Sequence, residues 1–216
     1  ERLRRQLAEN TPEGSYGLGH TRWATHGVPS ERNAHPMLDA RRRLAIIHNG
    51  IIENFLPIKR RLLEQGWEFH SDTDTEVVSN LISSHLEDDL RQAVLKAVAE
   101  LEGLFSFAVL STVSQRREIV AVRQGPPLIL GLGEEELYLA SDPAALLSHT
   151  KDVVFLESGD CARLSDDGVE IQRLDGDAAL GGERRRGRRS PSVPSGRWPA
   201  AGRRARARPR STPSTP

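Results

Sequence analysis

Polar residues in the first third of the chain have the types needed to hold an amino acid by its head group. Arg22 carries a planar guanidinium that fits a carboxylate with two parallel hydrogen bonds. Thr25 and His26 add a hydroxyl and an imidazole close to it in the chain. Asp74 only accepts hydrogen bonds when ionised, so it suits a substrate ammonium group. Together, these residues predict a site for a zwitterionic amino acid.

A second candidate element is the pair Asn49-Gly50, which directly follows the apolar run 44–47. The run predicts a strand that ends in a tight turn at this pair, where glycine lets the backbone approach a ligand closely. The side-chain amide of Asn49 and the backbone N–H of Gly50 would form an oxyanion hole with two donors. Such a hole would hold an oxyanion at the far end of the bound amino acid.

Each of these features also has a simpler structural explanation. A single arginine is usually a solvated surface charge, and Asn-Gly is foremost a hairpin signal. Residues 73–76 (Thr-Asp-Thr-Glu) match a capping box that opens a helix, a role compatible with ligand binding. Four histidines can be satisfied within turns: His20, His26, His35 and His48. What favours function is that the motifs at 19–27, 33–36, 48–54 and 71–76 occur in order.

The four motifs resemble the glutaminase domain of the glutamine:fructose-6-phosphate amidotransferases, the glucosamine-6-phosphate synthases. These are class II glutamine amidotransferases of the N-terminal-nucleophile hydrolase superfamily. The resemblance extends from about Gly17 to about Leu174 and includes the segments 123–128 and 140–142, the latter followed by a short helix. The phosphoribosylpyrophosphate amidotransferases of the purine pathway and the glutamate synthases keep Asn-Gly in a different setting, so they are the alternatives.

The resemblance implies a role for each residue that matches the family's motifs. Arg22 and Thr25 would bind the carboxylate of L-glutamine, with His26 nearby, and Asp74 would hold its α-amino group. Trp23 would be the aromatic residue that moves when the glutamine site closes, with core packing as the alternative role. Asn49 and Gly50 would be the catalytic pair of the oxyanion hole.

The implied activity is hydrolysis of L-glutamine to supply ammonia for glucosamine 6-phosphate synthesis. Fructose 6-phosphate would bind in isomerase domains that are missing from this sequence, and the parent enzyme would be a homo-oligomer. The family's nucleophile is an N-terminal cysteine, whereas this chain begins at Glu1 and its single cysteine is Cys161. We therefore expect an N-terminally truncated fragment that is inactive alone. A non-catalytic glutamine-binding remnant is the alternative.

Composition restricts the remaining functional classes. No apolar run approaches the length of a membrane span, and no signal peptide is visible. Cys161 alternates with its neighbours like a residue of a half-buried strand, so we expect an inert packing residue. A single cysteine fits a cytoplasmic enzyme. Zinc-type spacing and the P-loop pattern are both lacking, so neither a metal nor another cofactor is implied.

The C-terminal segment differs sharply from the rest in charge. Residues 183–216 hold eleven arginines and one acidic residue, whereas residues 1–182 hold nineteen basic and twenty-nine acidic residues. Such a segment buries too little apolar surface to offset its ordering entropy, so we expect a disordered tail over 177–216 and a single amidotransferase domain over 1–176. The tail fits an out-of-frame translation best. A native linker and a basic tail that binds nucleic acid or a membrane surface are the alternatives, and we expect no nucleic-acid partner.

The apolar pattern predicts helices first and strands later. Helices are expected at 54–65, from about 75, and at 89–102. Strands are expected at 44–47, 104–110, 118–123, 128–132, 136–140, 153–156, 160–164 and 169–173. This order indicates an α+β fold of antiparallel sheets covered by helices. The resemblance sharpens it to the four-layer αββα sandwich of the superfamily, incomplete at its N-terminus.

Overall fold

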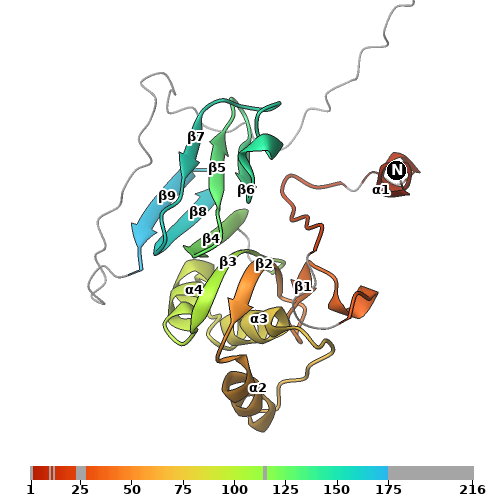
Figure 1. Ribbon diagram of the computed structural model, residues 1–216, viewed down its shortest axis with the longest axis vertical. Coiled ribbons are helices and arrows are strands. Elements are labelled where there is room, and N and C mark those ends of the chain that lie inside the picture. Colours follow the sequence, from red (N-terminus) through yellow and green to blue (C-terminus); the bar gives the residue numbers. More distant parts are fainter. Residues whose placement is uncertain (1, 10, 12, 23–27, 114–115, 175–216) are drawn as a thin grey trace, which may run out of the picture.

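Two antiparallel sheets, with helices packed on the larger one, form the fold (Figure 1). The computed structural model describes residues 2–9, 11, 13–22, 28–113 and 116–174. The larger sheet contains β1 (Met37–Leu38), β2 (Leu44–Ile52), β3 (Gly103–Ser111), β4 (Glu118–Gln124), β8 (Asp160–Ser165) and β9 (Gly168–Arg173). The smaller sheet contains β5 (Ile129–Leu132), β6 (Leu137–Ala140) and β7 (Val153–Phe155). The strand orders are β1-β2-β3-β4-β8-β9 and β6-β5-β7.

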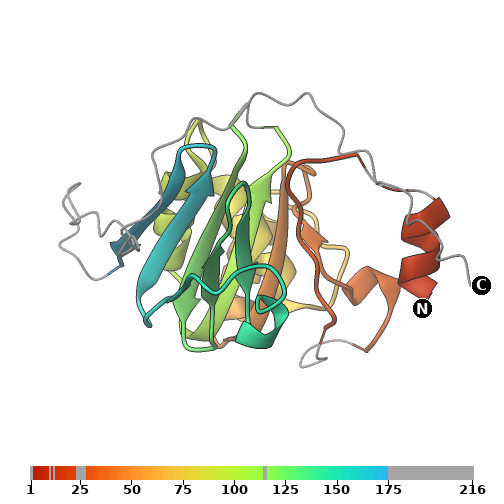
Figure 2. The same cartoon turned by 90° about the horizontal axis from the view of Figure 1, so that it is seen from above.

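The helices lie on the face of the larger sheet that points away from the smaller one (Figure 2). They are α2 (Phe55–Glu64), α3 (Asp74–Ser84) and α4 (Leu90–Val98). Two short 3-10 helices, η1 (Glu31–Asn33) and η2 (Pro143–Ala145), lie elsewhere in the chain. Helix α3 packs against β2, and α2 and α4 flank α3. Helix α1 (Arg2–Glu9) stands apart from both sheets in the two views.

The larger sheet is buried on both faces, and the two faces carry side chains of different size. Toward the helices it presents bulky residues that pack with α3 and α4: Ile46, Ile52, Phe105, Phe107, Val109, Val120 and Val122. Toward the smaller sheet, Ala108, Ala121 and Ala162 lie directly opposite one another on β3, β4 and β8. This row of small side chains leaves room for Leu128 and Leu130 in the core between the sheets.

The outer face of the smaller sheet is covered by the segment that begins with η2. Leu130 points toward the larger sheet, so its neighbours Ile129 and Gly131 point outward. Buried Leu146 lies beside Gly131 and closes this face. The succession of helices, sheet, sheet and covering segment confirms the predicted α+β sandwich.

The predicted strands and helices are present within a few residues of their expected ends, with one correction at the site. Strand β2 does not end in a turn at Asn49-Gly50, because it continues to Ile52 and pairs with β3 throughout. Gly50 has φ 108°, and a Cβ on it would lie 2.1 Å from the Leu104 carbonyl oxygen. The glycine therefore serves a close approach between two strands, not a hairpin. Helix α1 and strand β1 were not predicted.

This contact gives a test of the fold around the candidate site. Gly50→Ala should lower the free energy of unfolding by more than about 3 kcal/mol, because a backbone clash adds to an unfavourable φ. Gly66→Ala is the matched control: Gly66 also has positive φ, 82°, but no atom lies within 4 Å of its added Cβ. It should cost only about 1 kcal/mol. Urea unfolding followed by circular dichroism measures both, and equal losses would contradict the assigned clash.

Candidate functional site

The candidate site is built around the joint between strand β2 and the first turn of helix α3. The backbone N–H of Ile52 donates to Asp74 Oδ2 at 3.0 Å. Four residues earlier on β2, His48 Nδ1 and Thr75 Oγ1 of α3 are hydrogen-bonded at 2.9 Å. Both contacts are buried, and Asp74 itself is 3% exposed. Because buried hydrogen bonds of this kind are costly to break, the helix start is fixed to the strand.

The start of α3 is capped, although not by the reciprocal box that the sequence predicts. Thr73 Oγ1 accepts from the Glu76 N–H at 3.4 Å, as expected for an N-cap. The Glu76 carboxylate does not return to the Thr73 N–H, which donates instead to Ser71 Oγ at 3.3 Å. The Glu76 carboxylate instead accepts from the N–H groups of His70 at 2.8 Å and Ser71 at 2.6 Å. Glu76 thus braces the loop that leads into the helix.

A second loop, residues 28–36, is tied to this helix start by Asn33. Its side-chain Nδ2 donates to Asp72 Oδ2 at 3.2 Å and to the Val28 carbonyl at 3.0 Å. Its Oδ1 accepts from the Asp72 N–H at 3.0 Å. Asn33 is completely buried, so the motif at 33–36 has a structural role in which one amide joins two loops.

Asn49 is linked to the Arg22 segment through the imidazole of His20. His20 Nε2 lies 2.9 Å from Asn49 Oδ1, and His20 Nδ1 accepts the Arg22 N–H at 2.9 Å. Arg22 has φ 55°, which is uncommon outside glycine, and the bond to His20 closes the turn that holds it. The structure therefore joins a proposed oxyanion donor to the proposed carboxylate-binding residue.

His35 completes a group of histidines beside these residues. Its ring centroid lies 4.6 Å from that of His20. Burial, followed by electrostatic interactions with His20, His48 and Arg22, lowers the pKa of His35 to about 3. His35 is therefore neutral at ordinary pH. Within the part of the chain that the structure describes, these histidines do not assemble into a metal-binding group.

The structure thus brings together most of the predicted residues that it describes. Asn49 and Gly50 lie in β2, Arg22 is joined to Asn49 through His20, and Asp74 is joined to β2 through Ile52. Three predicted residues lie outside the described part of the chain: Trp23, Thr25 and His26.

Sequence reasoning missed the role of His20, and it misplaced His48. The sequence predicts that His20 is satisfied within a turn, but it also contacts Asn49, twenty-nine positions away. Its place two residues before Arg22 was the only local signal. His48 lies in strand β2 rather than in a turn, and its side chain is 4% exposed.

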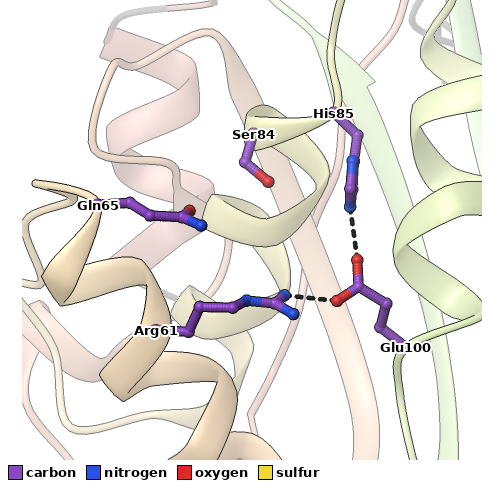
Figure 3. A pocket seen from close by; sticks show the side chains of 5 residues that line it. All are labelled: Arg61, Gln65, Ser84, His85 and Glu100. Atoms are coloured by element: carbon purple, nitrogen blue, oxygen red, sulfur yellow. Dashed lines mark hydrogen bonds and ion pairs between the residues drawn. The ribbon is translucent and has the colours of Figure 1, made fainter.

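A surface pocket of about 300 Å³ lies away from these residues, where α2, the end of α3 and the residues after α4 meet (Figure 3). Glu100 accepts there from Arg61 Nη2 at 2.5 Å and contacts His85 Nε2 at 2.7 Å. Burial favours the protonated form, but hydrogen bonds from Arg61 and His85 outweigh it and lower the pKa of Glu100. The Glu100 carboxylate offsets the charge of Arg61, and no predicted site residue lines this pocket.

Cys161 lies in β8 with its side chain 1% exposed. Burial raises the pKa of its thiol to about 12, so the thiolate that nucleophilic catalysis requires is absent at ordinary pH. This confirms the prediction of an inert packing residue. In the described ranges, no helix has the length and apolar character needed to cross a bilayer.

Comparison with known proteins gives a consistent family. The model of a family described as "Glutamine amidotransferase domain" matches residues 8–162. The glutamine–fructose-6-phosphate aminotransferase (isomerizing) of Aquifex aeolicus is 49% identical over 161 residues, which cover 74% of this chain and 27% of the relative. The enzyme of the same name from Gloeobacter violaceus is 51% identical over 171 residues, covering 79% of this chain and 28% of the relative. The chain thus spans less than a third of these relatives.

Solved structures show the same fold. A glutamine phosphoribosylpyrophosphate amidotransferase from B. subtilis, complexed with ADP and GMP, superposes with a TM-score of 0.61 at 24% identity, covering 72% of this chain and 34% of that one. A structure described as the allosteric regulatory enzyme of purine biosynthesis gives a TM-score of 0.57 at 25% identity, covering 66% and 31%. Both likenesses support the sandwich described above.

The environment of His35 predicts how stability depends on pH. The folded state keeps His35 neutral down to a pKa of about 3, whereas the unfolded chain binds a proton below 6.5. Between pH 3 and 6.5 the unfolded state therefore binds more protons than the folded state. The contribution of His35 to the free energy of unfolding is thus fully present above pH 6.5 and is lost as the pH falls toward 3. Urea unfolding at several pH values should show wild type losing more stability on acidification than His35→Gln. A His149→Gln control should keep the wild-type slope; an unchanged slope in His35→Gln would contradict the assignment.

Proposed function

The chain belongs to the glutamine amidotransferase domain family, and we propose that its site at the joint of β2 and α3 binds L-glutamine as an ammonia donor. By the same proposal, the ammonia aminates fructose 6-phosphate in glucosamine 6-phosphate synthesis. The support is sequence identity near one half to relatives named for that reaction. The fructose 6-phosphate site belongs to the part of the parent enzyme that this chain does not span.

The head group of glutamine is assigned to residues on both sides of the joint. Arg22 would pair with the α-carboxylate, and Asp74 would accept from the α-ammonium with the carboxylate oxygen not used by Ile52. Trp23, Thr25 and His26 are assigned to the same site from the family motif alone. A guanidinium and a carboxylate of opposite charge in one site select a zwitterion over a simple acid or amine.

The amide end of glutamine is assigned to Asn49 and Gly50, which would donate to the developing oxyanion. One observation carries this proposal: both Asn49 and the anchor of Asp74 are held by the same strand, β2. Strand β1 pairs only with Ala45 and Ile46, so in the described ranges no strand covers the edge of β2 beside Asn49. By this proposal, the substrate amide approaches the pair at this edge, which is not paired with another strand.

The chemistry of hydrolysis needs a nucleophile as well as an oxyanion hole. Cys161 is excluded from that role because its thiol is buried and its pKa is raised. The family supplies an N-terminal cysteine whose α-amine acts as the base, and that residue is not in this sequence. We therefore propose that the chain by itself binds glutamine without hydrolysing it.

Two broader assignments accompany this proposal. A single, buried free thiol fits the reducing cytoplasm, where we place the parent enzyme. The resemblance assigns it a homo-oligomeric state. Of the alternatives, a phosphoribosylpyrophosphate amidotransferase is less well supported, because the solved structure of that name is only 24% identical to this chain.

Binding of L-glutamine to the full chain tests the site. Arg22→Ala and Asp74→Asn should each weaken the dissociation constant about thirtyfold, because each removes a charge-assisted contact of about 2 kcal/mol. Asparagine keeps an acceptor for the Ile52 N–H, so the joint is preserved. Isothermal titration calorimetry measures the affinity, with Arg61→Ala in the surface pocket as the control. Unchanged binding by Arg22→Ala would refute the assignment.

A further inference from the structure

We propose that His20 is a positioning residue that fixes the carboxamide of Asn49 with its NH2 group turned toward the substrate amide. This inference deepens the proposed function and rests on it. The two hydrogen bonds made by the His20 ring carry the argument, because together they determine both the tautomer of His20 and the orientation of Asn49.

The tautomer follows from the backbone contact. The Arg22 N–H can only donate, so His20 Nδ1, 2.9 Å away, must be the acceptor and carries no hydrogen. In a neutral imidazole, the proton then resides on Nε2. That nitrogen lies 2.9 Å from Asn49 and must donate to it.

The orientation of Asn49 follows from the tautomer. An Nε2–H donor requires the oxygen of the carboxamide, not its nitrogen, to face His20. The reversed amide would need both ring nitrogens to accept hydrogen bonds, which a neutral imidazole cannot do. With Oδ1 held by His20, the two N–H bonds of Nδ2 are directed away from the ring.

This orientation decides whether Asn49 can stabilise an oxyanion. The terminal torsion of asparagine is broad and roughly two-fold, so a free carboxamide can present either its oxygen or its nitrogen. An oxygen facing the substrate would repel the developing negative charge, whereas the NH2 group attracts it. His20 removes this choice before the substrate binds. The ring of His35 also lies against His20, with 4.6 Å between the ring centroids.

The two contacts of His20 can be separated by substitution. Asparagine at position 20 is short, but its Oδ1 can still accept the Arg22 N–H in an Asx turn, which keeps Arg22 in place. It is too short to reach Asn49. Glutamine at position 20 carries a terminal NH2 at a reach closer to that of Nε2, so it can restore the donor to Asn49. The pair distinguishes positioning of the amide from general support of the loop.

The experiment compares two ligands on the full chain by calorimetry: L-glutamine and L-norvaline, which has the same head group but no side-chain amide. His20→Asn should lower the preference for glutamine over norvaline about fivefold, the effect of one lost hydrogen bond. His20→Gln should recover most of it, and a His149→Asn control should behave as wild type. An unchanged preference in His20→Asn, or an equal loss for both ligands, would overturn the proposal.

A second measurement keeps the inference testable if the chain binds no glutamine, a result that would refute the proposed function by itself. Two-bond 1H–15N correlation spectra of the unliganded chain report the protonation of each imidazole nitrogen of His20. The expected result is a protonated Nε2 and an unprotonated Nδ1 in wild type. A proton on Nδ1 would overturn the inferred orientation of Asn49, whatever the result of the binding experiment.

Discussion

The arrangement of the site depends on the attachment of one helix terminus to one strand. Asp74 accepts the N–H of Ile52, and Thr75 bonds His48, so the first turn of α3 cannot shift along β2 without breaking two buried contacts. Because β2 also carries Asn49, the spacing between the proposed ends of the glutamine site is set by this joint. The alanine row on the other face of the sheet lets the second sheet approach and keeps β3, the neighbour of β2, in place.

Several residues of the sequence motifs hold the fold together. Asn33 joins two loops, Glu76 braces the entry to α3, and Gly50 permits a close approach to Leu104. A substitution at any of them would disturb the site without removing a ligand contact. Asp74 has both characters, since one carboxylate oxygen holds the strand while the other is assigned to the substrate. A substitution in these motifs that abolishes binding therefore does not by itself show that the substituted residue contacts the ligand.

The elements of the fold were largely predictable because their apolar periodicity is regular. The strands from Gly103 onward are short apolar runs or alternate apolar with polar residues, and in α2, α3 and α4 apolar residues recur at helical spacing. The continuation of β2 through Gly50 was not predictable, because Asn-Gly is a strong turn signal and only the approach of Leu104 overrides it. The bond between His20 and Asn49 joins residues far apart in the chain, and no local pattern encodes such a pairing. Helix α1 has few apolar residues, and β1 has two residues, so neither gives a clear periodic signal.

The burial of Cys161 has a practical consequence for studying this chain. It is the single cysteine of the sequence. Its thiol is buried and, because its pKa is raised to about 12, stays protonated at neutral pH. Maleimide and iodoacetamide reagents react with accessible thiolates, so they should not label Cys161 in the folded chain. A cysteine placed at an exposed position would then accept a fluorophore or spin label at that position alone, without first removing a native residue.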